Sequence, residues 1–586
     1  MINLKDKPFC LNREDGSWVE KTLENMSLDE KVGQLFCPMG LSGKPGYLKH
    51  LIEDQHIAGL LYRPAGKKEI QETYRYIQNH AKIPMLLAAN TEAGGDGISF
   101  EGTSLGKPMS IAATDNVERA YQMGKVACKE GAALGMNWAF APIVDIDRNF
   151  HNPITNIRTF GSSPEKVLQC ASEYLRAADE ENVAVAIKHF PGDGCDERDQ
   201  HLLTSINDCS TAKWDATYGK IYKTLIEQGA KTVMAGHIAL PAYVKLINQN
   251  ATVEECLYPA SLSKELIMGL LRGKLGFNGL VSTDATPMVG FSNALPRSKA
   301  IPASVNAGCD IILFNKDLEE DISFILAAIK EGTLTIERVD EAVTRTLAVK
   351  ASLGLHRKQA KGQLVPSADS LDIIGCQKHK DISRQIADES VTLVRDKQSL
   401  LPLSIENYKR LYLNVVQKDT DLNNPLVQEW KNAFEKEGFE VAVRDRSIVV
   451  GVENLMGQNV TQEIENRIHE MYRSIDEFKT SCDLYVYIGN VENESNNTTT
   501  RLNWNVAYGL GDDLPWFVQE KPTLFISVAN PYHLFDVPMI KTYINAYDNN
   551  AFIREAVMDK IMGRSTFKGV SPIDPYCGNK YISGEF

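Results

Sequence analysis

The chain has 586 residues, of which 24% are charged and 43% hydrophobic, and its formal net charge is −13. At roughly 150 residues per domain, this length predicts two large domains. The ordinary composition excludes a disordered, collagenous or coiled-coil protein. Because the chain is acidic and has no block of five Lys or Arg residues, we expect it not to bind nucleic acid.

The sequence also bears on the cellular compartment. Residues 1–10 lack the apolar core of a signal peptide, and no uncharged apolar run reaches the roughly 18 residues that a membrane span needs. The 11 cysteines are dispersed without a Cys-x-x-Cys pair, which is typical of reduced thiols. We therefore expect a soluble, cytoplasmic protein with no membrane partner, and we expect Cys195 to be a small buried side chain.

Short apolar segments alternate with amphipathic helical segments from about Trp18 to Leu355. Such alternation is typical of parallel strands joined by helices. It predicts an α/β fold with a TIM-type eightfold β/α barrel over residues 1–355, and a doubly wound sheet is the structural alternative. The predicted strands are Val32–Pro38, Ala58–Tyr62, Met85–Ala89, Trp138–Val144, Ala184–Lys188, Thr232–Ala235, Gly279–Thr283 and Asp310–Phe314. The predicted helices include Asn116–Leu134, Ser163–Glu180, Ser261–Arg272 and Ile336–Leu353.

A second α/β pattern occupies residues 381–586. Residues 356–380 are polar and contain glycine and proline, so we predict a linker there. The polar run Asn493–Thr500 is predicted to be a loop. The second pattern comprises a helix over Asp381–Val394 and strands near Leu411–Val416, Leu484–Gly489 and Leu524–Ala529.

Polar side chains follow most of the predicted barrel strands. In a β/α barrel the active site is built at the carboxyl ends of the strands, so these side chains would converge on one mouth. Each alone fits a strand-end cap, but the set predicts a functional pocket. Its members are Asn90, Thr91, Glu92, Asp145, Asp147, Arg158, Lys188, His189, His237 and Asp284.

The segment from Lys188 to His201 holds the densest group of these residues. A basic pair at a strand end suits hydroxyl or anion binding. Asp199 is placed to accept the Nδ1 proton of His201 and to raise the basicity of the ring, although the spacing alone favours a polar surface loop. Asp284 ends an apolar strand, where it either faces the pocket or caps the next helix. A carboxylate opposite a proton donor is the minimum for retaining glycoside hydrolysis.

Two other kinds of site compete for these residues. A metal site would use His189, His201, His237, Asp193 and Asp284, but the sequence has no tight His pair, and we expect no metal or other cofactor. A phosphate cradle over residues 92–97 lacks the Lys-Ser/Thr of a P-loop, and its acidic members oppose an anion.

Taken together, these segments resemble glycoside hydrolase family 3, in particular its β-N-acetylglucosaminidase branch. The resemblance covers most of the chain, and its motifs are specific when taken together. It implies an αβα sandwich after the barrel. The segments that carry it are Trp18–Lys21, Met26–Phe36, Ala141–Ile146, Ile157–Gly161, Lys188–Gly192, Asp199–His201, Leu275–Leu280, Ala387–Val394 and Leu400–Leu403, with Asp284.

The resemblance also implies roles for single residues in a retaining exo-β-N-acetylglucosaminidase. Asp284 matches the nucleophile, His201 the general acid/base, and Asp199 the carboxylate that orients it. The positions that match binders of sugar hydroxyls are Arg158, Lys188 and His189.

Two departures from the family pattern lie in the predicted pocket. Asn90 stands where the branch has a sugar-binding Asp, Ala93 is inserted, and the Arg that usually follows the next glycines is absent. As an amide, Asn90 still binds a hydroxyl, but without charge. Asp193 stands where the branch commonly has His or Arg. These changes bear on the choice of sugar and leaving group.

Three alternative functions remain open. The first is a β-glucosidase whose acid is a second-domain Glu, for which Glu492 and Glu494 are candidates because they follow the predicted strand Leu484–Gly489. The second is a phosphorylase, since a neutral His acid repels phosphate less than a carboxylate does. The third is a non-catalytic sugar-binding protein. In each case the expected partner is a carbohydrate, and no motif indicates an oligomeric state.

Overall fold

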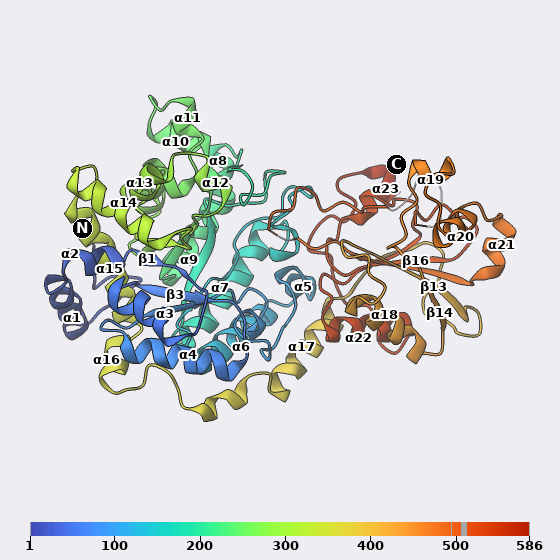
Figure 1. The fold of residues 1–586 in the computed structure, drawn as a ribbon, viewed down its shortest axis with the longest axis horizontal. Helices are drawn as coiled ribbons and strands as arrows, with labels where there is room; N and C mark the ends of the chain where they lie inside the picture. The colour runs from blue at the N-terminus through green and yellow to red at the C-terminus, as the bar shows by residue number, and fades with distance from the viewer. Residues whose placement is uncertain (1, 494, 505–512, 585–586) are drawn as a thin grey trace. The chain divides into compact units, whose positions relative to one another are not determined.

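The computed structural model describes residues 2–493, 495–504 and 513–584. Contacts between residues divide them into two compact units, both drawn in Figure 1. The first contains the described residues up to Pro108, Asn116–Ile382 and Ser495–Thr498. The second contains Met109–Asp115 and the other described residues from Ser383 onward. Among the described residues, no helix combines the length and the apolar character that crossing a membrane requires.

The main strands of the first unit form a parallel sheet that closes into a barrel. They are β1 (Phe36–Cys37), β2 (Met39–Gly40), β3 (Gly59–Tyr62), β4 (Leu86–Ala89), β5 (Trp138–Ala139), β6 (Ala184–Phe190), β8 (Thr232–Ala235), β10 (Leu280–Ala285) and β11 (Ile311–Leu313). Their order is β1-β11-β10-β8-β6-β5-β4-β3-β2. Since β1 pairs with β11 and β2 with β3, these two are halves of one strand interrupted at Pro38. With the halves joined, the described residues confirm the predicted eightfold barrel.

Most strands lie within two residues of their predicted bounds, and two of them differ by more. The first lies at residues 36–40 rather than at Val32–Pro38, because Leu28–Gly33 forms helix α2, which starts with a capping box between Ser27 and Glu30. The predicted strand Trp138–Val144 keeps regular pairing only in β5, since Pro142 has no N–H to donate to a ladder.

Helices cover the outside of the barrel (Figure 1). They include α4 (Lys67–His80), α6 (Glu118–Leu134), α7 (Pro164–Glu180), α9 (Lys220–Gln228), α13 (Arg297–Ala307) and α15 (Ile336–Ser352). The covered strands are buried on both faces, which explains their continuous apolar sequences. Local signals set the helix ends: the Ser163 hydroxyl accepts the Lys166 N–H at the start of α7, and α6 ends at Gly135 with a φ of 105°. The helix predicted over Ser261–Arg272 lies at Glu265–Lys274.

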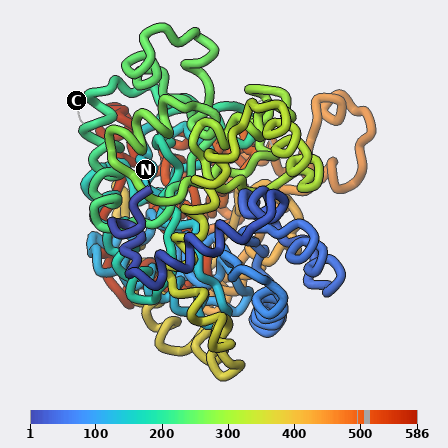
Figure 2. Tube along the Cα trace, turned by 90° about the vertical axis from the view of Figure 1, so that its left-hand side faces the viewer, coloured from blue at the N-terminus to red at the C-terminus, as the bar shows by residue number. Residues whose placement is uncertain are grey.

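The beginning and the end of the barrel segment lie side by side. Helix α1 (Arg13–Glu24) packs along α15, and both Figure 1 and Figure 2 show the dark-blue start of the chain against the yellow-green helix. Asp15 of α1 also pairs with Arg357 and, at 2.9 Å, with Nε2 of His356. These contacts help to hold the barrel closed.

The segment predicted as a linker, residues 356–380, packs on the first unit. It contains α16 (Leu355–Ala360) and a short helix, Ala368–Ile373. Gln71 of α4 donates to the Ser367 carbonyl at 3.2 Å, and His379 Nδ1 lies 2.6 Å from the buried Glu130 carboxylate. The polar residues of this segment therefore form hydrogen bonds with the barrel helices, and the segment is not an extended, solvent-exposed linker.

The second unit is built on a mixed sheet. Its strands are β12 (Thr392–Asp396), β13 (Arg410–Gln417), β14 (Glu440–Val443), β15 (Leu484–Asn490), β16 (Thr523–Ser527) and β17 (Thr542–Asn545). Their order is β12-β17-β16-β15-β13-β14, and only β12 runs antiparallel to its neighbour among these described strands. The helix predicted over Asp381–Val394 ends earlier: α17 (Gln377–Ser390) stops before the β-branched run that begins β12.

Alternate residues of the central strand β15 pack into two different cores. Leu484, Val486 and Ile488 join the core beneath α18 (Pro425–Lys436) and α22 (Ala551–Ile561). Tyr485 and Tyr487 join an aromatic core on the other face, with Phe478 of α21 (Ile475–Ser481). Helices thus cover both faces, and the unit is a three-layer α/β domain.

Candidate active site

Asp284 lies at the carboxyl end of β10, at the mouth of the barrel. It belongs to the strand rather than to the cap of a helix. Its Oδ1 accepts the Ala285 N–H at 2.7 Å, and its Oδ2 lies 3.8 Å from His189 Nε2. The side chain is 14% exposed, so a substrate can reach it.

His189, at the end of β6, is oriented by a buried carboxylate. Its Nδ1 lies 2.7 Å from Asp145 Oδ2, while Asp145 Oδ1 accepts the His189 backbone N–H at 3.1 Å. A carboxylate only accepts, so Nδ1 carries a proton and Nε2 faces Asp284. Asp145 and His189, which follow the predicted strands Trp138–Val144 and Ala184–Lys188, are therefore in contact, as expected.

The predicted sugar-binding cations Arg158 and Lys188 converge on Glu92. Arg158 donates to both carboxylate oxygens, at 3.0 and 2.9 Å, and Lys188 Nζ donates to Oε1 at 2.6 Å. Burial alone would raise the pKa of Glu92, but the two cations hold it well below its ordinary value. This cluster has a net charge of +1 and offers both donors and acceptors to sugar hydroxyls.

Asp284 is ionised because histidines surround it. Burial would raise its pKa, but the nearby His189, His237 and His201 keep it below its ordinary value. His237 is itself buried, and burial lowers its pKa. Its Nε2 lies 2.9 Å from the Ala285 carbonyl, so this nitrogen carries the proton and supports the turn after Asp284.

Asp199 and His201 form the predicted pair. Asp199 Oδ1 lies 2.6 Å from His201 Nδ1 and accepts the His201 backbone N–H at 2.9 Å. The other ring nitrogen, Nε2, is thus the one turned away from Asp199, and the imidazole is 23% exposed. The Val289 N–H donates to the His201 carbonyl at 2.9 Å, which ties the pair to the segment after β10.

Asn496 contributes a contact that the sequence did not indicate. Its backbone N–H donates to Asp199 Oδ2 at 2.7 Å, so both oxygens of Asp199 are engaged. Asn496 has a φ of 70°, a left-handed conformation that Asn tolerates better than most residues. The only sequence signal was the polar, Asn-rich run predicted to be a loop.

Replacing Asn496 by Pro is expected to lower kcat about 10- to 100-fold, because it removes a hydrogen bond to a charged group. Pro also cannot adopt the positive φ. Asn496→Gly keeps both the N–H and the conformation and should retain activity within about twofold. Initial rates with a good and a poor leaving group check this, since a disturbed acid/base pair penalises the poor one more. Equal losses with both leaving groups would contradict it.

The remaining candidates are less integrated into the site. Asn90 is exposed, and a Cβ on Gly97 would meet the Asn90 carbonyl at 1.7 Å, so the inserted loop folds tightly against its backbone. Glu492 accepts a hydrogen bond from Asn549 at 3.3 Å within the second unit. Glu494 lies outside the described residues.

Asp193, the second departure from the family pattern, is buried next to Asp145. Its N–H donates to Asp145 Oδ1 at 2.8 Å, and its own Oδ1 accepts the Gly194 N–H at 2.7 Å. Burial, together with the charge of Asp145, raises the pKa of Asp193 to about 7. Asp193 therefore holds a proton through much of the acidic range.

Replacing Asp193 by Asn should stabilise the fold more at pH 8 than at pH 5. The folded protein keeps this proton up to about pH 7, whereas the unfolded chain loses it near pH 4, so the wild type loses stability as pH rises between these values. The amide cannot ionise, and its gain in stability relative to the wild type between pH 5 and pH 8 is up to about 3 kcal/mol. Urea unfolding at both pH values measures it. If the free energies of unfolding of the wild type and of Asp193→Asn differed by the same amount at both pH values, the prediction would be wrong.

The fold and the site together define a barrel enzyme that acts on glycosides. The pattern of the glycosyl hydrolase family 3 N-terminal domain matches residues 27–349. The chain belongs to this family.

Two relatives extend over nearly the whole chain. A β-N-acetylglucosaminidase/β-glucosidase of Cellulomonas fimi is 39% identical over 579 residues, which are 99% of each chain. A solved β-glucoside phosphorylase with 2FGlc bound is 42% identical, covers 98% of this chain and 99% of its own, and superposes with a TM-score of 0.90. A family 3 β-N-acetylglucosaminidase from Paenibacillus sp. shares the fold at 23% identity, with a TM-score of 0.75 over 94% of this chain and 100% of its own.

Proposed function

We propose that the protein is a retaining, exo-acting enzyme that cleaves terminal β-linked N-acetylglucosamine and glucose through a glycosyl ester on Asp284. The observation that carries the proposal is the Asp199–His201 pair, hydrogen-bonded at 2.6 Å and tied to the segment after the ionised Asp284. The Cellulomonas fimi relative, described with both activities, supports both sugars.

In the first step, Asp284 attacks the anomeric carbon while the bond to the leaving oxygen breaks. His201 starts as an imidazolium whose Nδ1–H is held by Asp199, and it gives its Nε2 proton to the leaving oxygen. The Asp199 carboxylate stabilises the charged ring. The products of this step are the free aglycone and the glycosyl ester.

In the second step, a water or another acceptor opens the ester. Neutral His201 accepts the acceptor's proton at Nε2 and returns to its starting state, and Asp284 leaves as a carboxylate. Two inversions at the same carbon preserve the β configuration. Arg158 and Lys188, both held by Glu92, are positioned to bind sugar hydroxyls during both steps.

Phosphate is the second candidate acceptor, because the acid/base is a histidine. After the first step Asp284 is an uncharged ester and His201 is neutral, so an approaching phosphate meets no carboxylate acid/base. The cluster of Arg158, Lys188 and Glu92 keeps its net charge of +1. The β-glucoside phosphorylase that is 42% identical supports this route.

A panel of aryl β-glycosides tests the proposal. Turnover should be highest with β-GlcNAc and β-glucose and low with β-GalNAc and β-xylose. If phosphate is the acceptor, a β-sugar 1-phosphate forms in phosphate buffer and the rate rises with phosphate concentration at constant ionic strength. Free sugar as the sole product in phosphate would assign hydrolysis instead. Binding of sugars without turnover of any glycoside would overturn the proposal and indicate a non-catalytic protein.

A further inference from the structure

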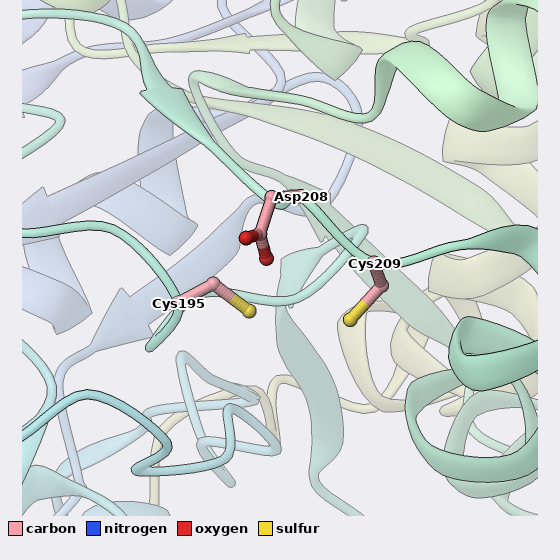
Figure 3. Close-up of side chains that lie close together, drawn as sticks. All are labelled: Cys195, Asp208 and Cys209. Carbon is pink, nitrogen blue, oxygen red and sulfur yellow. The ribbon is translucent and has the colours of Figure 1, made fainter.

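Two cysteines and a carboxylate meet beside the loop that carries the acid/base pair. The sulfur atoms of Cys195 and Cys209 and a carboxylate oxygen of Asp208 all lie within 4.8 Å of one another. Figure 3 shows the two thiol groups pointing toward each other from different chain segments. Cys195 is half-buried rather than fully buried as predicted, and Cys209 is buried. Asp199 and His201 lie in the chain between them.

Arg148 decides which chemistry suits this cluster. Its Nη1 donates to the sulfur of Cys209 and lies 3.5 Å from the sulfur of Cys195. A guanidinium at both sulfurs repels a divalent metal ion but stabilises a thiolate. The cluster is therefore better suited to redox chemistry than to metal binding.

The hydrogen bonds identify which cysteine is the thiolate. The Tyr218 hydroxyl donates its proton to the Asp193 carbonyl at 2.7 Å, so it gives no proton to the Cys195 sulfur, 3.5 Å away, and Cys195 keeps its own S–H to donate to Cys209. Cys195 is then the thiol. A hydrogen bond with Cys195, together with the charge of Arg148, lowers the pKa of the Cys209 thiol to about 6 even though burial opposes this.

We propose that Cys195 and Cys209 form a redox-active pair, which hydrogen peroxide oxidises to a disulfide that lowers the enzyme's activity. The Cys209 thiolate attacks one peroxide oxygen, the O–O bond breaks, and hydroxide leaves, giving a sulfenic acid at Cys209. The Cys195 sulfur then attacks the Cys209 sulfur, the S–O bond breaks, and the hydroxide leaves with the Cys195 proton as water. In total, one thiolate, one thiol and one peroxide give one disulfide, one water and one hydroxide.

The disulfide would act on the acid/base pair because it closes the segment that contains it. A disulfide holds its sulfur atoms about 2 Å apart, so its formation fixes both side chains and draws the Cys195 and Cys209 segments together. Cys195 is held on its other side by Asn149, which donates to its carbonyl at 3.1 Å. On the side toward Asp199, the next residue, Asp196, accepts the Ile206 N–H at 2.8 Å. A shift of Cys195 is therefore passed through Asp196 to the loop that carries Asp199, and a displacement of about 1 Å at a catalytic group can cost roughly 100-fold in rate.

Peroxide treatment of the full chain tests the proposal. Non-reducing peptide mapping should show a Cys195–Cys209 cross-link, with the loss of two hydrogen atoms from the intact mass. Turnover of the best aryl glycoside should fall at least about tenfold and return with dithiothreitol. Cys195→Ser and Cys209→Ser should each abolish the cross-link and the peroxide sensitivity, and Cys209→Ala serves if the serine variant folds poorly. Cys256→Ser, which changes a buried cysteine outside the cluster, should stay as sensitive as the wild type.

Several results would overturn the proposal. These are the absence of the cross-link, a cross-link that leaves turnover unchanged, or stoichiometric zinc binding that Cys209→Ser abolishes. The effect on activity rests on the proposed function, but the cross-link does not. If the reduced wild type turned over no glycoside, the proposed function would be wrong. The cross-link found by peptide mapping would then still test the redox pair.

Discussion

Replacing Asp284 by Asn is expected to lower the turnover of an aryl β-glycoside by on the order of 10⁴-fold or more, because the amide has no anionic oxygen to attack the anomeric carbon. The fold should be kept, since the Asn carbonyl still accepts the Ala285 N–H that Asp284 Oδ1 now accepts at 2.7 Å. Initial rates and thermal midpoints of both proteins measure this. Turnover near that of the wild type would show that Asp284 is not the nucleophile.

A rescue experiment separates loss of the nucleophile from loss of structure. Asp284→Gly leaves space beside the anomeric carbon, where azide can replace the missing carboxylate. Azide should restore turnover of a substrate with a good leaving group and give an α-glycosyl azide, because only one inversion then occurs. A product of β configuration would mean that another residue still acts as the nucleophile.

The convergence of several predicted side chains followed from their equivalent positions at the ends of successive strands. Parallel barrel strands present their carboxyl ends at one mouth, so the polar residues at the carboxyl ends of β6 and β10 and those directly after β4 converge there. The contact of Lys188 with Glu92 and the proximity of His189 to Asp284 follow from this rule. The spacing of Asp199 and His201 allowed their hydrogen bond but by itself favoured a polar surface loop, and the family resemblance was the signal that singled out the pair.

Contacts between distant segments were not predictable in this way. Asn496 donates a backbone N–H to Asp199, a residue 297 positions earlier, and a backbone donor has no side-chain signature. Cys195 was predicted to be an inert buried thiol, because its proximity to Cys209 and Arg148 is a property of the folded chain.

The prediction of secondary structure also failed where contacts with a segment distant in the sequence determine the conformation. The end of the helix predicted over Asp381–Val394 is instead β12, which pairs with β17 about 150 residues later. In that pairing the β-branched residues of β12 form hydrogen bonds with a neighbouring strand. The apolar pattern of the segment alone did not show that this neighbour exists. The predicted linker is held in the same way by hydrogen bonds to residues of the barrel helices.

Replacing His201 by Ala is expected to reduce turnover of a poor leaving group by about 10²- to 10⁴-fold, the usual contribution of a general acid. An activated aryl leaving group needs little protonation, so the first step with it should slow much less. Asp199→Asn should show the same dependence in weaker form, because the amide no longer stabilises the imidazolium. Burst kinetics that separate the two steps, measured with a series of aryl leaving groups, check these expectations.

The comparison with Glu492→Ala decides between the two sources of the acid. Glu492 contacts Asn549 within the second unit, whereas His201 is tied to the segment that follows Asp284. Glu492→Ala should therefore leave the leaving-group dependence unchanged, and the same measurement on Glu494→Ala covers the other candidate. If a glutamate variant rather than His201→Ala lost more with the poor leaving group, the enzyme would draw its acid from the second domain. His201 would then be a substrate-binding residue.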